Sequence, residues 1–154
     1  MNSIEQIDVK SWIPQVHDIL AAHPEIVLAY LHGSAANGSM TPLSDIDIAL
    51  VIDETRLAKK DRLDFELTIA DEISLRVNFY EIDARIINTA PIMFKGEVVT
   101  NGLLIFSRDE DARVEFETRT RSEYFDFKPT AEFLREAFFE DVQRRGLDGQ
   151  RAQS

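Results

Sequence analysis

Two aspartates stand inside a segment that is otherwise strongly apolar, Ser44-Asp45-Ile46-Asp47-Ile48-Ala49-Leu50-Val51. Side chains alternate between the two faces of a strand, so both carboxylates are expected on one face and the intervening isoleucines in the core. Two like charges so close together favour a bound divalent cation, and Mg²⁺ shared with substrate phosphates is the usual instance. A solvated strand end, where both acids merely cap the following loop, is the alternative interpretation.

A Gly-Ser pair lies ten residues before these acids. Gly33 and Ser34 follow the continuous apolar run Ile26–Leu31, which is typical of a strand buried on both faces. Glycine allows the backbone to approach a phosphate closely, and serine offers a hydroxyl and an N–H to phosphate oxygens. A plain glycine turn also explains the pair taken alone. The whole combination, with the acid pair on a second buried strand, predicts metal-assisted phosphoryl or nucleotidyl transfer.

These segments carry a resemblance to a known family. The stretches Tyr30-Leu31-His32-Gly33-Ser34-Ala35-Ala36-Asn37-Gly38 and Ser44-Asp45-Ile46-Asp47-Ile48-Ala49 resemble the DNA polymerase β-like nucleotidyltransferase superfamily. Within it, the chain is similar to the minimal nucleotidyltransferase (MNT) antitoxins of bacterial MNT–HEPN modules. The resemblance implies an α/β or α+β fold, a mixed β-sheet flanked by helices. It also implies that AMP passes from ATP, with Mg²⁺, to a tyrosine of a helical HEPN ribonuclease toxin.

The same resemblance suggests roles for individual residues. It implies that Asp45 and Asp47 bind the metal. It implies further that the phosphates and the nucleotide lie against four small residues of the loop, Gly33, Ser34, Gly38 and Ser44.

Two departures from the family pattern affect the chemistry that we expect. The family usually has a third carboxylate on the next strand, which we place at Val77–Ile82, and the aligned residue is Asn78. We therefore expect Asn78 to complete the catalytic set, although an amide cannot act as a base. The loop after Ser34 is also uncharged, and the nearest bases are on the next helix, at Arg56, Lys59 and Lys60.

Three functions remain open on these residues. The first is an antitoxin that transfers AMP to a toxin tyrosine, which the Gly-Ser and acid-pair combination favours. The second is a binding module with weak or lost catalysis, which Asn78 and the uncharged loop favour. The third, a transferase that acts on a small molecule, usually needs a second substrate domain, for which 154 residues leave little room.

Composition narrows the class of protein further. We expect one domain over residues 1–145 and a frayed tail over 146–154. The absence of cysteine excludes disulfides and agrees with a cytoplasmic location. No signal-peptide pattern occurs, and no apolar run reaches the roughly 18–20 residues that span a bilayer. The net charge of −11 disfavours nucleic acid and anionic membranes as partners, and is compatible with a basic protein or a small nucleotide that arrives with its metal ion. The resemblance implies a HEPN toxin as the partner, and a second copy of the chain is a further candidate.

The pattern of apolar residues predicts a sheet covered by helices. We expect strands at Ile26–Leu31, Ile46–Ile52, Val77–Ile82 and Leu103–Phe106. We expect helices at Pro14–Ala22, Thr55–Leu75, Pro91–Val99, from Asp109 onward, and at Thr130–Arg144.

Other residues that could do chemistry receive no site. His17 and His23 have no partner at ligand spacing, and His32 is expected in the core or at a strand edge. Aromatic residues gather toward the C-terminus, and burial in the core is their default role. An apolar face that binds a helical partner is the alternative. These residues are Tyr124, Phe125, Phe127, Phe133, Phe138 and Phe139.

Overall fold

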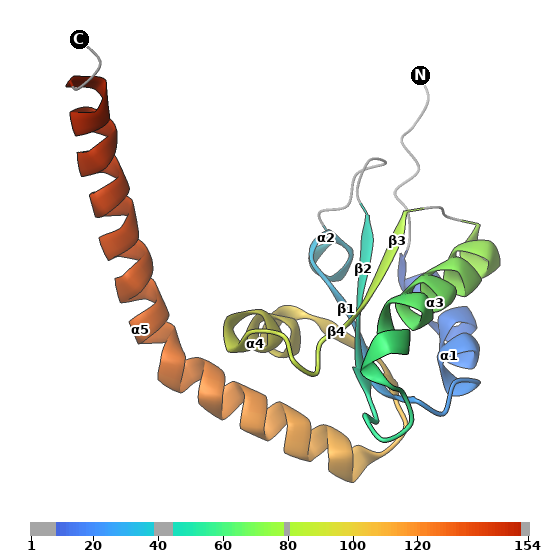
Figure 1. Cartoon of the computed structure of the whole chain (residues 1–154). Helices are drawn as coiled ribbons and strands as arrows, with labels where there is room; N and C mark the ends of the chain where they lie inside the picture. The colour runs from blue at the N-terminus through green and yellow to red at the C-terminus, as the bar shows by residue number, and fades with distance from the viewer. Residues whose placement is uncertain (1–8, 39–44, 79–80, 152–154) are drawn as a thin grey trace.

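The chain folds around one mixed sheet of four strands, which carries helices on both faces (Figure 1). The computed structural model describes residues 9–38, 45–78 and 81–151. The strands lie in the order β3-β2-β1-β4, and β1 is antiparallel to β2 and to β4, whereas β2 and β3 are parallel. This arrangement confirms the predicted α+β fold. The strands are β1 (Ile26–His32), β2 (Ile46–Ile52), β3 (Ile82–Ile86) and β4 (Leu103–Ser107).

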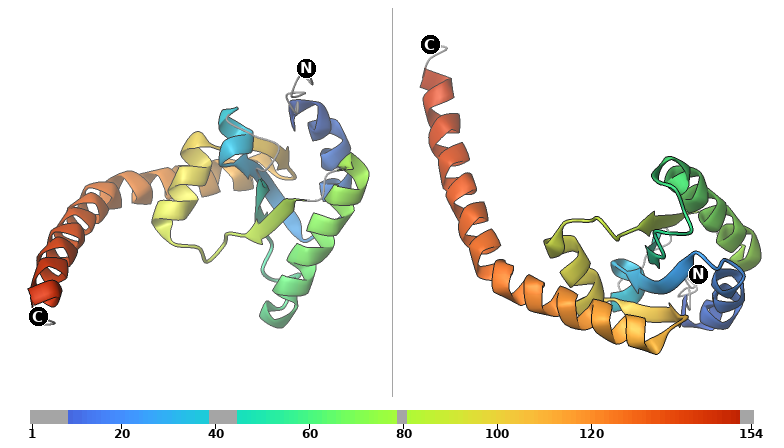
Figure 2. Two further views of the ribbon diagram at one scale, coloured as in Figure 1. Left: turned by 90° about the horizontal axis from the view of Figure 1, so that it is seen from above. Right: turned by 60° about the horizontal axis from the view of Figure 1, so that its bottom comes forward.

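The helices form two layers. α1 and α3 cover one face of the sheet, and α4 with the first half of α5 covers the other (Figures 1 and 2). The alternation along β2 explains both layers, because Ile48 packs toward α1 and α3 while Ala49 packs toward α4. The helices are η1 (Val9–Trp12), α1 (Ile13–Ala21), α2 (Ser34–Asn37), η2 (Lys59–Asp61), α3 (Arg62–Val77), α4 (Ile92–Asn101) and α5 (Glu110–Arg151).

The third strand lies later in the chain than the sequence predicts. The expected strand Val77–Ile82 is wrong: α3 continues through Val77, and β3 begins only at Ile82. Ile69 and Ile73 are buried, and Val77 extends their four-residue spacing against the same core cluster, so the helical stripe prevails. Asn78 then ends the helix in a left-handed conformation, with φ of 55°.

The start of α3 also differs from expectation. Thr55 is not the N-cap of a helix, because its N–H and its hydroxyl both donate to Asp53 Oδ1, at 3.0 Å and 2.6 Å. Such a turn lets the side chain of Asp53 satisfy the backbone that leaves β2. The helix therefore begins several residues later, at Arg62.

The base of α5 is fixed to the sheet by a buried polar contact. Tyr30 on β1 donates a hydrogen bond to Glu117 Oε1 at 3.0 Å, and Arg113 contacts the other carboxylate oxygen at 3.0 Å. Next to this contact, a Cβ at Gly96 of α4 would overlap the ring of Tyr124. The absence of a side chain at Gly96 therefore lets α4 and α5 pack closely.

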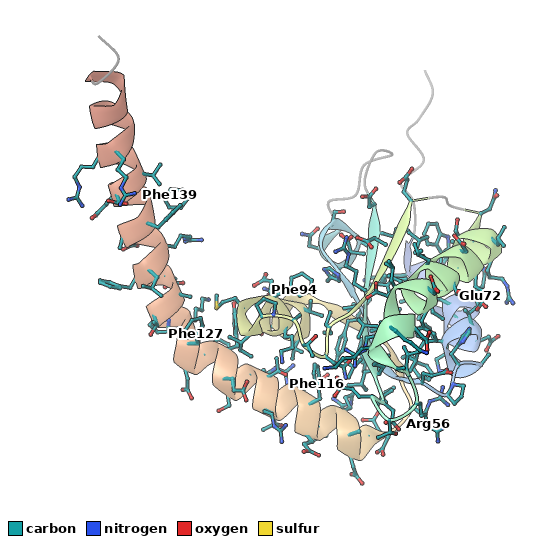
Figure 3. The ribbon with its side chains drawn as sticks, in the orientation of Figure 1. Arg56, Glu72, Phe94, Phe116, Phe127 and Phe139 are labelled. Carbon is teal, nitrogen blue, oxygen red and sulfur yellow. The ribbon has the colours of Figure 1, made fainter. Side chains whose placement is uncertain are left out.

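The helix α5 is one continuous helix with a bend. The sequence predicts a separate helix at Thr130–Arg144, but α5 runs through Pro129 as far as Arg151. Proline lacks the N–H for the helical hydrogen bond and clashes with the preceding turn, so it bends the helix without ending it. Figure 3 labels Phe127 at this bend, beyond which residues 130–151, here called the arm, leave the sheet. Residues 147–151, part of the segment 146–154 where composition predicts fraying, continue the helix, since extending a formed helix costs less than nucleating one.

Candidate active site

Gly33 makes room for a carboxylate at the end of β1. Its backbone has φ of 67° and ψ of −145°, which other residues rarely adopt, and a Cβ there would lie 2.9 Å from Asp47 Oδ2. Ser34 begins the short helix α2 next to it, and Gly38 ends that helix in a left-handed conformation. The structure therefore brings together Gly33 and Asp47, which the sequence analysis expected at the phosphates and at the metal of one site. Ser44 lies outside the described residues.

Polar residues form a row across the neighbouring strands β1, β2 and β3. Asp47 on β2 is paired with His32 on β1 and with Asp83 on β3. Paired residues of neighbouring strands point to the same face, and here it is the face that α4 and α5 cover. All three side chains line an open pocket of about 630 Å³, together with Arg85, Ile86, Ile87, Ala90 and Phe94.

Asp83 takes the place that the sequence assigned to Asn78. The assignment of Asn78 depended on a strand at Val77–Ile82, and Asn78 instead caps α3. The residue beside Asp47 on the third strand is Asp83, a carboxylate that can accept a proton. A signal was present in the sequence, because Ile82, Ala84 and Ile86 alternate with Asp83 and Arg85 as a half-buried strand requires.

The electrostatics of the pocket are dominated by the carboxylates. Burial raises the pKa of Asp47 above its ordinary value, and the negative charges of Asp83 and Asp45 add to this shift in the pKa. Arg85 Nε lies 3.2 Å from both carboxylate oxygens of Asp83. Arg85 is thus a basic residue of the site, and the sequence did not indicate it. Arg56, one of the bases that the sequence indicated, instead pairs with Asp53 at the other end of β2, at 3.5 Å.

His32 is the last residue of β1, which lies between β2 and β4, so it is half-buried at a strand end and is not on an edge strand. Burial lowers the pKa of its imidazole below the ordinary value, against the attraction of Asp47 and Asp83. Its ring lies edge-on to Phe94 of α4, with 5.4 Å between the ring centroids. The neutral ring therefore joins the polar row to the apolar wall of the pocket. The other two histidines make structural contacts: His23 contacts Glu72 at 2.7 Å, and His17 packs on Phe106.

The donor set suits a hard cation that arrives with phosphates. In the part of the chain that the structure describes, no three His, Asp or Glu side chains are arranged to hold a metal ion by themselves. The carboxylates of Asp45, Asp47 and Asp83 nonetheless offer only oxygen atoms as ligands, and Mg²⁺ prefers oxygen ligands. The negative charges of Asp45 and Asp83 repel that of Asp47, and such a cation would relieve this repulsion. The remaining ligands would come from the phosphates of a nucleotide.

A Gly-Ser turn next to carboxylates on adjacent strands suits nucleotidyl transfer. The comparison of the chain with family models points to the same chemistry. The model described as polymerase beta, nucleotidyltransferase, matches residues 14–111. The chain is therefore a member of this nucleotidyltransferase family. A comparison with curated proteins found no match.

Three of the solved structures to which the chain is similar are toxin–antitoxin complexes. A chain in the crystal structure of a toxin–antitoxin with AMP-PNP is 25% identical, with a TM-score of 0.63 over 85% of this chain and 98% of that chain. Another, in the tri-AMPylated Shewanella oneidensis HEPN toxin in complex with MNT antitoxin, is 23% identical, with a TM-score of 0.59 over 87% and 98%. A chain of the MntA–HepT toxin–antitoxin is 23% identical, with a TM-score of 0.58 over 87% and 98%. These likenesses agree with the resemblance to MNT antitoxins.

Within residues 9–38, 45–78 and 81–151, no helix combines the length and the apolar character that crossing a bilayer requires.

Proposed function

We propose that this protein is an antitoxin that transfers AMP from ATP to a tyrosine of a HEPN ribonuclease toxin in the cytoplasm. The observation that carries the proposal is the pairing of Asp47 with Asp83 on neighbouring strands, with Gly33 against Asp47. The similar solved structures, one with AMP-PNP and one with an AMPylated toxin, support it.

The reaction assigns a separate task to each residue of the pocket. The tyrosine oxygen bonds to the α-phosphorus of ATP, the bond from that phosphorus to the bridging oxygen breaks, and pyrophosphate leaves. Asp83 accepts the proton of the tyrosine, and Arg85 keeps its carboxylate in position. Asp45 and Asp47 would hold Mg²⁺, which when bound neutralises the phosphates and the leaving group.

Two parts of the site suit the two parts of this chemistry. The backbone of Gly33 lies next to Asp47, and Ser34 follows it at the start of α2, where phosphate oxygens can approach. The apolar lining of the pocket includes Ala90 and Phe94, with Phe94 40% exposed. An exposed ring in a polar pocket fits stacking against the acceptor tyrosine.

Mass spectrometry of the intact toxin tests the proposal. The chain and its toxin are incubated with ATP and Mg²⁺, and AMP additions are counted over time. Asp83→Asn removes the base, and we expect transfer to fall by about 10²–10⁴-fold. Asp53→Asn, at the far end of β2, is the matched control and should leave the rate unchanged. A toxin that gains no AMP from the wild-type chain contradicts the proposal.

A second substitution separates the structural assignment from the sequence-based one. If Asn78 stood in the place of the third acid, Asn78→Asp would speed the transfer. Because Asn78 caps α3 and Asp83 already supplies the carboxylate, we expect no acceleration. Asp tolerates the left-handed conformation nearly as well as Asn, so the fold should persist.

A binding module without catalysis is the alternative function. The contact of Arg85 with both oxygens of Asp83 favours it, because this contact occupies a carboxylate that the reaction needs. In that case the chain would inhibit the ribonuclease equally well with and without ATP. Ribonuclease assays after removal of the chain distinguish the two, since covalent AMP persists and a bound inhibitor does not.

A further inference from the structure

The arm of α5 exposes large apolar side chains that the chain itself leaves uncovered. Phe133 is 69% exposed and Phe138 is 63% exposed, whereas Tyr124, on the same helix before the bend, is 4% exposed. Figure 1 shows the arm extending away from the sheet, with no other element beside it. Burial in the core, the default prediction for these aromatic residues, is therefore wrong for all except Tyr124.

The apolar residues surround the arm and do not form one seam. Successive residues of a helix are about 100° apart, so Leu134, Phe138 and Val142 share one stripe. Phe139 lies about 100° to one side of Phe138, and Phe133 lies about 140° to the other side. Charged residues, including Arg135, Glu136 and Asp141, lie between them, so the arm presents several exposed apolar strips of the kind that a partner covers. Pairing with one other helix would leave Phe133 or Phe139 in water, whereas a groove between helices would cover them.

The arm has a charge in proportion to that of the rest of the chain. Residues 130–146 contain four acids and three bases, and the whole chain has a net charge of −11. A partner that binds the arm therefore also meets the negative charge of the remaining surface, which favours a partner that is not itself acidic. A second copy of the chain would bring its own excess of negative charge toward the carboxylates of the pocket.

The arm and the pocket face a common space. His32, Asp47 and Asp83 lie on the sheet face that α4 and α5 cover, and the arm rises on that side of the sheet (Figure 1). Figure 3 labels Phe94, at the pocket wall, between the sheet and the arm that carries Phe139. A protein that held the arm in a groove would therefore also stand in front of the pocket.

We infer that the arm is the docking element for the protein that accepts AMP, which encloses it in an apolar groove. This inference rests on the proposed function for the identity of the partner. The bend at Pro129 then sets the angle at which the acceptor tyrosine meets Asp83. Docking through the arm gives specificity for the acceptor, while the pocket supplies the chemistry.

The test compares an arm variant with a matched control in the full chain. The double variant Phe133→Ala/Phe138→Ala removes two rings that contact little of their own chain, and Leu63→Ala removes a side chain on α3 that is 65% exposed. We expect the double variant to weaken toxin binding by at least about tenfold and Leu63→Ala to leave it unchanged. Calorimetry measures both affinities, and circular dichroism verifies that the variants are folded.

Transfer assays then separate this inference from the proposed function. The double variant should transfer AMP slowly at low toxin concentration and at nearly the normal rate at saturating toxin, with unchanged affinity for ATP. Unchanged toxin affinity in the double variant overturns the inference. Sedimentation that shows a wild-type dimer and a monomeric double variant also overturns it, in favour of a second copy. If the double variant loses toxin binding but the wild type transfers no AMP, only the proposed function fails.

Discussion

The two halves of α5 are parts of the same helix, yet they bury different residues. Before the bend, Glu117, Thr120 and Tyr124 are buried at helical spacing against α4 and the sheet. Beyond it, the arm carries rings that are more than half exposed, including Phe138 and Phe139. Two of the buried residues of the first half, Glu117 and Thr120, are polar, whereas the aromatic residues of the arm are exposed. Burial along this helix is thus decided by what lies beside it, and among the described residues the arm has no such neighbour.

The largest expected effect lies in the sheet, at Gly33. Gly33→Ala forces a strained backbone and pushes a methyl group against Asp47 Oδ2, which a Cβ would approach to 2.9 Å. Misplacing a reacting group by about 1 Å costs on the order of 10²-fold in rate, so we expect a loss of that size in AMP transfer. Single-turnover incorporation of labelled AMP measures it.

Gly38→Ala is the matched control for this prediction. Gly38 also has a positive φ, of 75°, but a Cβ there would have no atom within 4 Å. Both variants should lose stability, and Gly33→Ala should lose more of it, because ψ of −145° at a positive φ excludes a side chain more strictly than the left-handed conformation of Gly38. Gly33→Ala should also lose far more transfer activity. Equal losses of activity would mean that strain in the loop, and not the position of Asp47, controls the reaction.

The next effect concerns the packing that distinguishes the two halves of α5. Gly96→Ala would place a methyl group inside the ring of Tyr124, and overpacking of this kind costs about 1–3 kcal/mol of the free energy of unfolding. Phe138→Ala in the arm removes a larger side chain but should change that free energy by less than about 0.5 kcal/mol. Urea denaturation measures both. A large loss in Phe138→Ala would show that the arm packs on its own chain in solution.

These contrasts also show how far the sequence could predict the structure. Continuous apolar runs identified β1, β2 and β4 nearly to the residue. β1 and β2 are buried on both faces, whereas the edge strand β4 is apolar but exposes Leu104. The third strand was missed because Val77 continues both a helical and a strand pattern, and only packing of α3 on the sheet decides between them. That one shift misassigned Asn78 and hid Asp83.

The exposure of the arm lay beyond sequence reasoning for a different reason. Aromatic residues on a helix indicate burial, but they do not indicate in which molecule the covering surface lies. Pro129 suggested a helix boundary, whereas the structure makes it a bend.

A smaller effect is expected where α5 is fastened to the sheet. Tyr30→Phe removes the hydrogen bond to Glu117 Oε1, whereas Arg113 and Arg121 still contact Glu117 Oε2. A buried acceptor that loses one donor costs about 1–3 kcal/mol, and we expect the lower end of that range. Thermal unfolding measures the loss. Unchanged toxin binding by the folded variant would show that the arm acts independently of this fastening.

The smallest effect compares two aspartates at opposite ends of β2. Burial raises the pKa of Asp47, so its contribution to stability is fully present below the ordinary value of about 3.9 and is lost as pH rises through the higher folded-state value. Asp47→Asn should therefore stabilise the nucleotide-free protein at neutral pH, and the gain should vanish in acid.

The pKa of Asp53 is lowered by the hydroxyl and the N–H of Thr55, so its contribution is present at neutral pH and is lost as pH falls. Asp53→Asn should accordingly destabilise the protein at neutral pH. Urea titrations of both variants between about pH 2 and 8 measure the two slopes, which should have opposite signs, that of Asp47 above the ordinary pKa of aspartate and that of Asp53 below it. Equal slopes would mean that the charges of the two carboxylates do not determine the pH dependence of stability. The interpretation that the folded protein keeps Asp47 charged for catalysis, at the expense of stability, would then be wrong.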